Sequence, residues 1–300
     1  MARLLPVLMM VFGIGILSLM DALVKTIGPF YPVWQITFLR YVAGLVAIVP
    51  FVLALRPEFP SWPVIRANGL RGILVVGAGV CFFKAIQFIP LALATSLFFT
   101  APLVISVLGW VMLKEPVPRS AAVAILLGLV GVVVICSGTL AAETLDEPFE
   151  QLAMGLGLAF AAALFYAVAM VTIRARTRGD PIVTIILMQT IGGTVVSALP
   201  GLLVWHPIQP EHWVVYATIG ACGTSGFFLL SHALARAPVA TLAPIEYSAF
   251  LWASLWGYLF FAEMPRDTTL VGAALIVVAG LIVIRSAKTQ RVAPAEVPPV

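Results

Sequence analysis

A few ionisable side chains lie inside long apolar runs of the sequence, and their types are those that can bind charged ligands or carry protons. These residues are Asp21, Arg40, Lys84, His232 and Glu246. An ionised side chain at the centre of a bilayer costs at least about 3 kcal/mol, so its presence in such a run indicates a functional site. The alternative role is structural, in which these groups pair with one another or with backbone carbonyls and fix helix positions.

Local spacing supports both interpretations. Asp21 and Lys25 are four residues apart, a spacing that favours a local ion pair on a helix. Gln35 lies near Arg40 on the same predicted helix. Arg40 is therefore either a functional cation or a residue that orients its own helix.

Aromatic residues occur close to these polar positions. We predict that Phe98, Phe99, Tyr166 and Tyr247 bind substrate together with Lys84, because apolar walls with a few convergent polar groups form a ligand site. Lys84 would bind a carboxylate, and the ring faces would accept a ring-bearing substrate or an organic cation. Most other aromatic residues are expected to pack or to face lipid.

The composition sets the environment in which these residues act. Of 300 residues, 62% are hydrophobic and only 10% are charged, whereas a soluble domain carries about 25% charged residues. The polar surface is too small to cover a water-soluble globule. In a bilayer the backbone must form helices or a closed barrel, and the unbroken apolar runs favour helices. The sequence predicts an all-α integral membrane protein.

Apolar runs bounded by Pro, Gly and charged residues predict about ten transmembrane helices. Their ranges are 5–27, 33–55, 70–89, 93–113, 120–138, 152–173, 182–204, 213–235, 239–261 and 269–285. Pro102 and Pro244 fall within two of these ranges and are expected to kink them. The polar, Pro-rich residues 287–300 are predicted to form a disordered cytoplasmic tail.

The basic residues predict the orientation of the chain. With a cytoplasmic N-terminus, thirteen Lys and Arg residues lie in inside segments, and only Lys25 and Arg266 lie outside. Cytoplasmic loops carry the excess of basic residues. We therefore predict a multi-pass protein of a bacterial-type inner membrane with both termini cytoplasmic.

The chain contains an internal repeat with an offset of 148 residues. Residues 85–92 align with 233–240, and Glu115 aligns with Glu263. The repeat unit contains five spans, so the second copy is inverted relative to the first. We predict two inverted five-helix repeats, 1–140 and 141–286, around a central cavity. This organisation is typical of secondary transporters that work by alternating access.

Two local patterns carry a resemblance to a known family. A Pro turn, a small-residue start to the next helix and a terminal Glu occur at Pro90 with Glu115 and again at Pro238 with Glu263. The second predicted span also contains the run Phe38-Leu39-Arg40. These features resemble the EamA-type domain, which occurs twice in the drug/metabolite transporter superfamily. Within it, the aromatic second half is most similar to the aromatic amino-acid exporters of the YddG type.

The two predicted halves differ in their charged positions. The offset places Lys84 opposite His232 and Phe98 opposite Glu246, and Gln189 stands roughly where Arg40 stands. We assign His232, Glu246, Asp21 and Arg40 to gating or proton coupling. In this hypothesis His232 and Glu246 pair to close the inner end, which gives an outward-facing resting state. The alternative is a static clasp between helices.

Other function classes lack their sequence signatures. A membrane-embedded enzyme would need catalytic motifs such as HExxH, a pump would need a P-loop, and neither is present. A channel is disfavoured because no filter-like loop occurs, and the single asparagine, Asn68, excludes a paired Asn-Pro-Ala motif. Cys81, Cys136 and Cys222 lie in apolar runs, so no metal or cofactor is expected.

We therefore expect a transporter whose partners are a small-molecule substrate and the lipid bilayer, with no nucleic acid. The resemblance and the aromatic residues near Lys84 predict export of aromatic or bulky apolar amino acids and related amphipathic compounds. Nucleosides and cationic drugs are the alternative substrates. A monomer is expected, with a dimer as the alternative.

Overall fold

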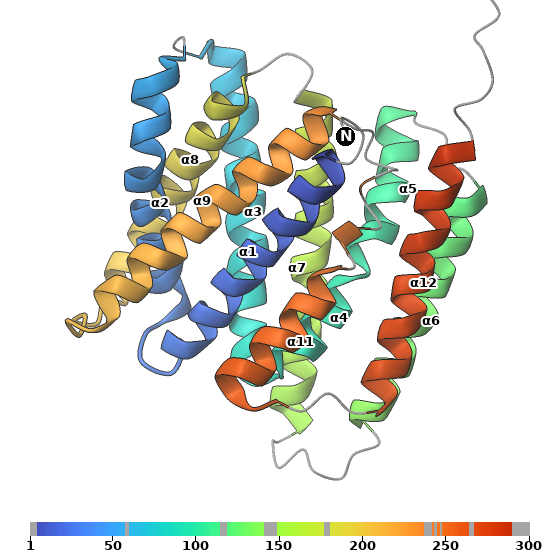
Figure 1. Ribbon diagram of the computed structural model, residues 1–300. Coiled ribbons are helices and arrows are strands. Elements are labelled where there is room, and N and C mark those ends of the chain that lie inside the picture. The colour runs from blue at the N-terminus through green and yellow to red at the C-terminus, as the bar shows by residue number, and fades with distance from the viewer. Residues whose placement is uncertain are drawn as a thin grey trace, which may run out of the picture.

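The computed structural model describes residues 5–57, 60–114, 119–140, 149–176, 181–236, 242, 245–246, 248–263 and 267–289. The described chain forms eleven α-helices and contains no strand (Figure 1). In the first half these are α1 Leu5–Ile27, α2 Val33–Leu55, α3 Trp62–Phe88, α4 Leu91–Phe98, α5 Ala101–Leu113 and α6 Arg119–Leu140. In the second half they are α7 Phe149–Arg176, α8 Ile182–Leu203, α9 His212–Arg236, α11 Ser248–Phe261 and α12 Asp267–Thr289.

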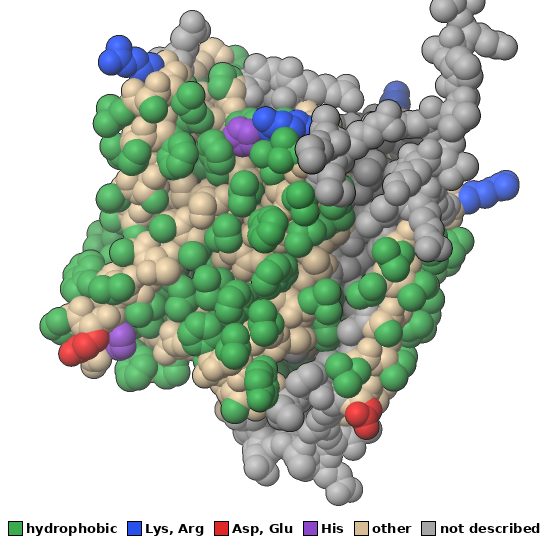
Figure 2. All heavy atoms as spheres, in the orientation of Figure 1, with side chains coloured by type: hydrophobic (Ala, Val, Ile, Leu, Met, Phe, Trp, Pro, Cys, Tyr) green, Lys and Arg blue, Asp and Glu red, His purple; other side chains and the backbone are tan. Residues whose placement is uncertain are grey.

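The helices have the lengths and the apolar surfaces that a bilayer requires. Six of them, α1, α2, α3, α7, α8 and α9, are long and apolar enough to cross a membrane. Shorter apolar helices occur in the α5, α6, α11 and α12 regions. Figure 2 shows that hydrophobic side chains cover the visible face of the molecule and that the charged side chains lie near its upper and lower edges. The predicted all-α membrane architecture is confirmed.

Two helix boundaries differ from the sequence prediction. The predicted fourth span is divided into α4 and α5, with the break at Phe99 and Thr100. A proline occupies the first turn of α5. It is tolerated there because the N–H groups of the first turn have no partner within the helix. Pro244, the second predicted kink, lies outside the described residues. At the C-terminus α12 continues to Thr289, so the predicted tail starts later than residue 287; its remainder is not among the described residues.

The third helix begins eight residues before the predicted start at residue 70, which places Arg71 inside the protein. Its side chain is only 1% exposed. Its Nη2 donates to the Ile185 carbonyl at 3.2 Å and to Gln189 Oε1 at 2.7 Å. Arg71 therefore joins α3 to α8, whereas the charge count had placed it in a cytoplasmic loop.

The most extensive helix contacts join the two halves of the chain, and contacts within a half are smaller. α1 contacts α9, and in the same way α7 contacts α3. α2 contacts α8 and α9, and correspondingly α8 contacts α2 and α3. α6 packs on α12 beside the main bundle (Figure 1). Exchanging the halves leaves this contact pattern unchanged, as expected for two interlocking repeats related by a pseudo-two-fold axis.

Glycines allow the closest of these approaches. A Cβ atom added to Gly220 on α9 would lie 2.3 Å from Ala43 Cβ and 2.7 Å from the Gly44 backbone nitrogen on α2. A Cβ atom on Gly193 of α8 would lie 2.5 Å from the Tyr41 ring. Small residues permit such backbone contact between membrane helices, and here they bring α2 against α8 and α9.

We predict that Gly220→Ala lowers the free energy of unfolding by about 1–3 kcal/mol, because the added methyl group meets backbone that cannot rotate away. The matched control is Gly157→Ala on the exposed face of α7, where no atom lies within 4 Å of the added Cβ. Thermal unfolding of both purified variants in detergent measures the difference. Equal melting temperatures would contradict the packing described for α2 and α9.

Candidate functional site

A cavity of about 140 Å³ lies at the centre of the bundle and is lined by helices from both halves. α1 contributes Asp21 and Ser18, α2 contributes Arg40, and α4 contributes Thr95 and Phe98. The remaining lining residues are apolar or aromatic apart from Tyr166 and Glu246; they include Phe82, Phe83, Phe99, Phe227 and Leu230. Sites of this kind are mostly apolar and hold a few polar groups that orient a ligand.

A helix end and a helix start border the cavity. α4 ends at Phe98, which lines the cavity, and Glu246 lies two residues before the start of α11 at Ser248. Phe98 and Glu246 are separated by the repeat offset of 148. Helix ends that meet at a central cavity are a recurrent feature of substrate sites in transporters.

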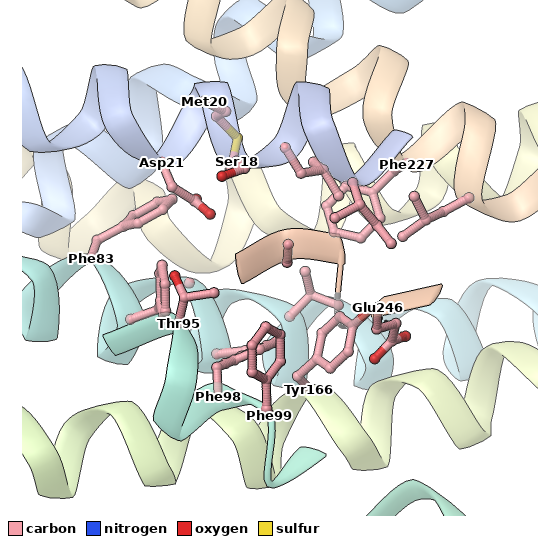
Figure 3. Close-up of a pocket in the computed structure, with 18 of the residues that line it drawn as sticks. Ser18, Met20, Asp21, Phe83, Thr95, Phe98, Phe99, Tyr166, Phe227 and Glu246 are labelled. Carbon is pink, nitrogen blue, oxygen red and sulfur yellow. Dashed lines mark hydrogen bonds between the residues drawn. The ribbon is translucent and has the colours of Figure 1, made fainter. Parts of the chain in front are cut away.

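Figure 3 shows Asp21, Ser18 and Thr95 at one end of the cavity and Tyr166 with Glu246 at the other. Phe98 and Phe99 lie between these groups. The centroid of the Phe98 ring is 5.4 Å from that of Phe82 and 4.9 Å from that of Tyr166. The cavity therefore has two polar ends joined by an aromatic wall.

Among the described residues, Arg40 is the only basic one that lines this cavity. Its side chain is 6% exposed, and its guanidinium carbon lies 4.4 Å from the Tyr41 ring centroid and 5.6 Å from that of Phe83. The described residues offer Arg40 neither a salt bridge nor an acceptor within hydrogen-bond distance. Gln35 does not orient it, because Gln35 forms two hydrogen bonds with the backbone of His206, at 2.8 and 2.7 Å. Arg40 thus presents a buried cation to the cavity.

At the opposite end the Tyr166 hydroxyl donates a hydrogen bond to Glu246 Oε1 at 3.1 Å. Glu246 is 7% exposed. The predicted pair between His232 and Glu246 is absent from this structure. His232 instead places Nδ1 2.9 Å from the Phe228 carbonyl, and its ring lies 4.2 Å from the Phe228 ring. The helical turn between Phe228 and His232 supplies a nearer partner than Glu246.

Lys84 lies away from the cavity. Its Nζ donates to Gln87 Oε1 at 3.1 Å and lies 4.8 Å from the centroid of the Phe88 ring. Lys84 therefore does not join Phe98, Phe99 and Tyr166 in the cavity wall. Tyr247, the fifth residue of the predicted substrate site, lies outside the described residues.

Lys25 forms an ion pair with Glu263 rather than with Asp21. Its Nζ also lies 4.9 Å from the Phe261 ring centroid. The pair joins the C-terminal ends of α1 and α11 and is the only salt bridge in the described part of the chain. Sequence spacing favoured the local partner, but the approach of α11 places a second carboxylate beside Lys25. Asp21 is thereby left facing the cavity.

Sequence reasoning missed three contributors to this site. Ser18 and Thr95 have small hydroxyl side chains with no distinctive spacing, and only the three-dimensional structure shows that both line the cavity. The Lys25–Glu263 pair joins residues 238 positions apart. The repeat offset did single out Glu263, but it gave no indication of its partner.

Comparisons with known proteins agree with this architecture. The EamA-like transporter family matches residues 4–137 and 153–285. The pseudopaline exporter of Pseudomonas aeruginosa is 27% identical over 292 residues, covering 94% of this chain and 96% of its own length. The S-adenosylmethionine uptake transporter of Rickettsia bellii is 25% identical over 268 residues and 89% of both chains.

A solved crystal structure shares the fold. It has a TM-score of 0.74 and 21% sequence identity, and the match covers 94% of this chain and 97% of that one. Together with the two matched segments, which span both halves of the chain, this similarity identifies the protein as a membrane transporter of the EamA-like transporter family, within the drug/metabolite transporter superfamily.

Proposed function

We propose that the protein exports small amphipathic metabolites, with aromatic or bulky apolar amino acids as its substrates. The observation that carries this proposal is the buried Arg40 guanidinium, which lines the largely aromatic cavity and has neither a salt bridge nor a hydrogen-bond acceptor among the described residues. An α-carboxylate would bind Arg40 through charge-assisted hydrogen bonds. The α-ammonium group would bind Asp21, and the side chain would pack on Phe82 and Phe98.

The alternative is transport of organic cations or nucleosides. It is supported by the two carboxylates at the cavity, Asp21 and Glu246, against one basic residue. A cation without a carboxylate would use the acidic groups and the ring faces and would not need Arg40. The relatives include one exporter and one uptake transporter, so the direction of transport is also part of our proposal.

We further propose that transport proceeds by alternating access, with both termini cytoplasmic. The basic residues favour this orientation. The ends of α1 and α11 would then face the outside, and the Lys25–Glu263 pair would close the cavity on that side. This assignment replaces the His232–Glu246 gate that the sequence suggested at the inner end.

The first test concerns recognition of the carboxylate. Arg40→Met should raise the KM for phenylalanine efflux at least about tenfold, because a hydrogen bond to a charged group contributes about 1.5–3 kcal/mol. Lys84→Met is the matched control, since Lys84 lies outside the cavity, and it should transport normally. Efflux of labelled phenylalanine from inverted or right-side-out vesicles measures both. Equal loss in the two variants, or loss only in Lys84→Met, would contradict the proposed role of Arg40.

The second test concerns closure of one end. The two partners are half-buried, with 17% and 24% of their side chains exposed, and such a pair contributes up to about 1 kcal/mol. Lys25→Glu should therefore increase labelling of a cysteine introduced by Ser18→Cys about fivefold from the outside, in a background without the native cysteines. Adding Glu263→Lys restores the pair and should return labelling to its original rate. Unchanged labelling in Lys25→Glu would exclude this pair as a closure.

A further inference from the structure

The carboxylate of Glu246 lies at the end of the cavity farthest from Asp21 (Figure 3). Among the described residues only Tyr166 donates a hydrogen bond to it, and that bond reaches Oε1. No Lys, Arg or His of the described chain lies within salt-bridge distance of it. The one basic side chain of the cavity, Arg40, is not among its partners.

A buried carboxylate with a single neutral donor is costly in an apolar site unless a cation approaches it. The described residues do not supply that cation, because His232 is directed to the Phe228 carbonyl and Lys25 is paired with Glu263. The surroundings suit a ligand cation instead. The Tyr166 ring lies against Phe98, and both rings line the cavity that Glu246 faces, so aromatic faces and a carboxylate are available to one positive group.

The repeat shows that this charge is specific to one end. The position that matches Glu246 in the first half is Phe98, so the scaffold accepts an apolar side chain there. The carboxylate therefore adds a polar group at one end of an otherwise aromatic wall. Asp21 and Arg40 already provide for the two charges of an amino-acid head group at the other end.

We propose that Glu246, positioned by Tyr166, recognises a second cationic group at the distal end of the substrate. The preferred substrate class is then an amphipathic amino acid that carries an amine or another positive group beyond its apolar or aromatic portion. This inference rests on the proposed function, since it takes the Asp21–Arg40 end as the site of the amino-acid head group.

The test uses three probes that differ in one group: L-phenylalanine, 4-methyl-L-phenylalanine and 4-(aminomethyl)-L-phenylalanine. Their affinities are measured by equilibrium binding to the purified full-length protein in lipid nanodiscs. The wild type should bind the aminomethyl probe at least about tenfold more tightly than the methyl probe. Glu246→Gln should abolish that preference, so that the aminomethyl and methyl probes bind the variant with similar affinities. Glu150→Gln, at an exposed position in the first turn of α7, is the matched control and should retain the preference.

Tyr166→Phe supplies a second measurement, because it keeps the ring and removes the hydroxyl that positions Glu246. It should reduce the ratio between the affinities for the aminomethyl probe and the methyl probe. Equal affinities of the wild type for the two substituted probes would overturn the proposal. A preference that persists in Glu246→Gln would also overturn it.

A fourth probe, 4-methylbenzylamine, carries the cation without an amino-acid head group. If it binds in a Glu246-dependent manner while none of the amino acids binds, the proposed amino-acid function fails and the cation site stands. If phenylalanine binds, but the affinities for 4-(aminomethyl)-L-phenylalanine and 4-methylbenzylamine do not depend on Glu246, the amino-acid function stands and the cation site fails. If no probe binds, both proposals are rejected.

Discussion

The structure depends on one constraint, which is that a backbone inside a bilayer must satisfy its own hydrogen bonds. Long helices meet this requirement, and six of the described helices are long enough to cross a membrane. The requirement also restricts where a helix can be interrupted. The described break between α4 and α5 borders the cavity and not the lipid, and Phe99 and Thr100 keep backbone hydrogen bonds there to Thr95 and Leu97, at 3.2 and 3.1 Å. The interruption therefore brings Phe98 and Phe99 to the cavity while the backbone at the break keeps its hydrogen bonds.

Superimposed on this symmetric scaffold is an asymmetric set of charges. The contact pattern of the helices is the same when the halves are exchanged, yet Arg40 in one half corresponds roughly to Gln189 in the other, and Glu246 corresponds to Phe98. A shared scaffold of this kind would support the two equivalent arrangements that our proposal of alternating access requires. The unequal charges make the two ends of the cavity chemically different, with Asp21 at one end and Glu246 at the other.

Sequence patterns were sufficient for the elements that depend on local information. Apolar run length predicted the ends of most described helices to within a few residues, although α3 begins eight residues earlier than predicted. Pro102 predicted a kink in the fourth span, where the structure has the break between α4 and α5. The exceptions share a physical cause. Arg71 is a cation near a helix start, which suggested a loop, and it is buried only because Gln189 and a carbonyl of α8 accept its hydrogen bonds. Lys25 pairs with Glu263 because of helix packing, and His232 contacts the Phe228 carbonyl within its own helical turn. Residue spacing alone does not determine which of several possible partners a side chain binds.

The burial of Arg71 has a mechanical consequence. Its side chain is 1% exposed, and two of its nitrogen atoms, Nε and Nη1, are buried without an acceptor. Sliding α3 along α8 would remove the acceptors of Nη2 as well and leave a bare cation in a low-dielectric interior. The contacts of Arg71 therefore resist any sliding of α3 along α8. The Lys25–Glu263 pair at the ends of α1 and α11 is a different kind of contact, because 17% and 24% of its side chains are exposed and water can replace it.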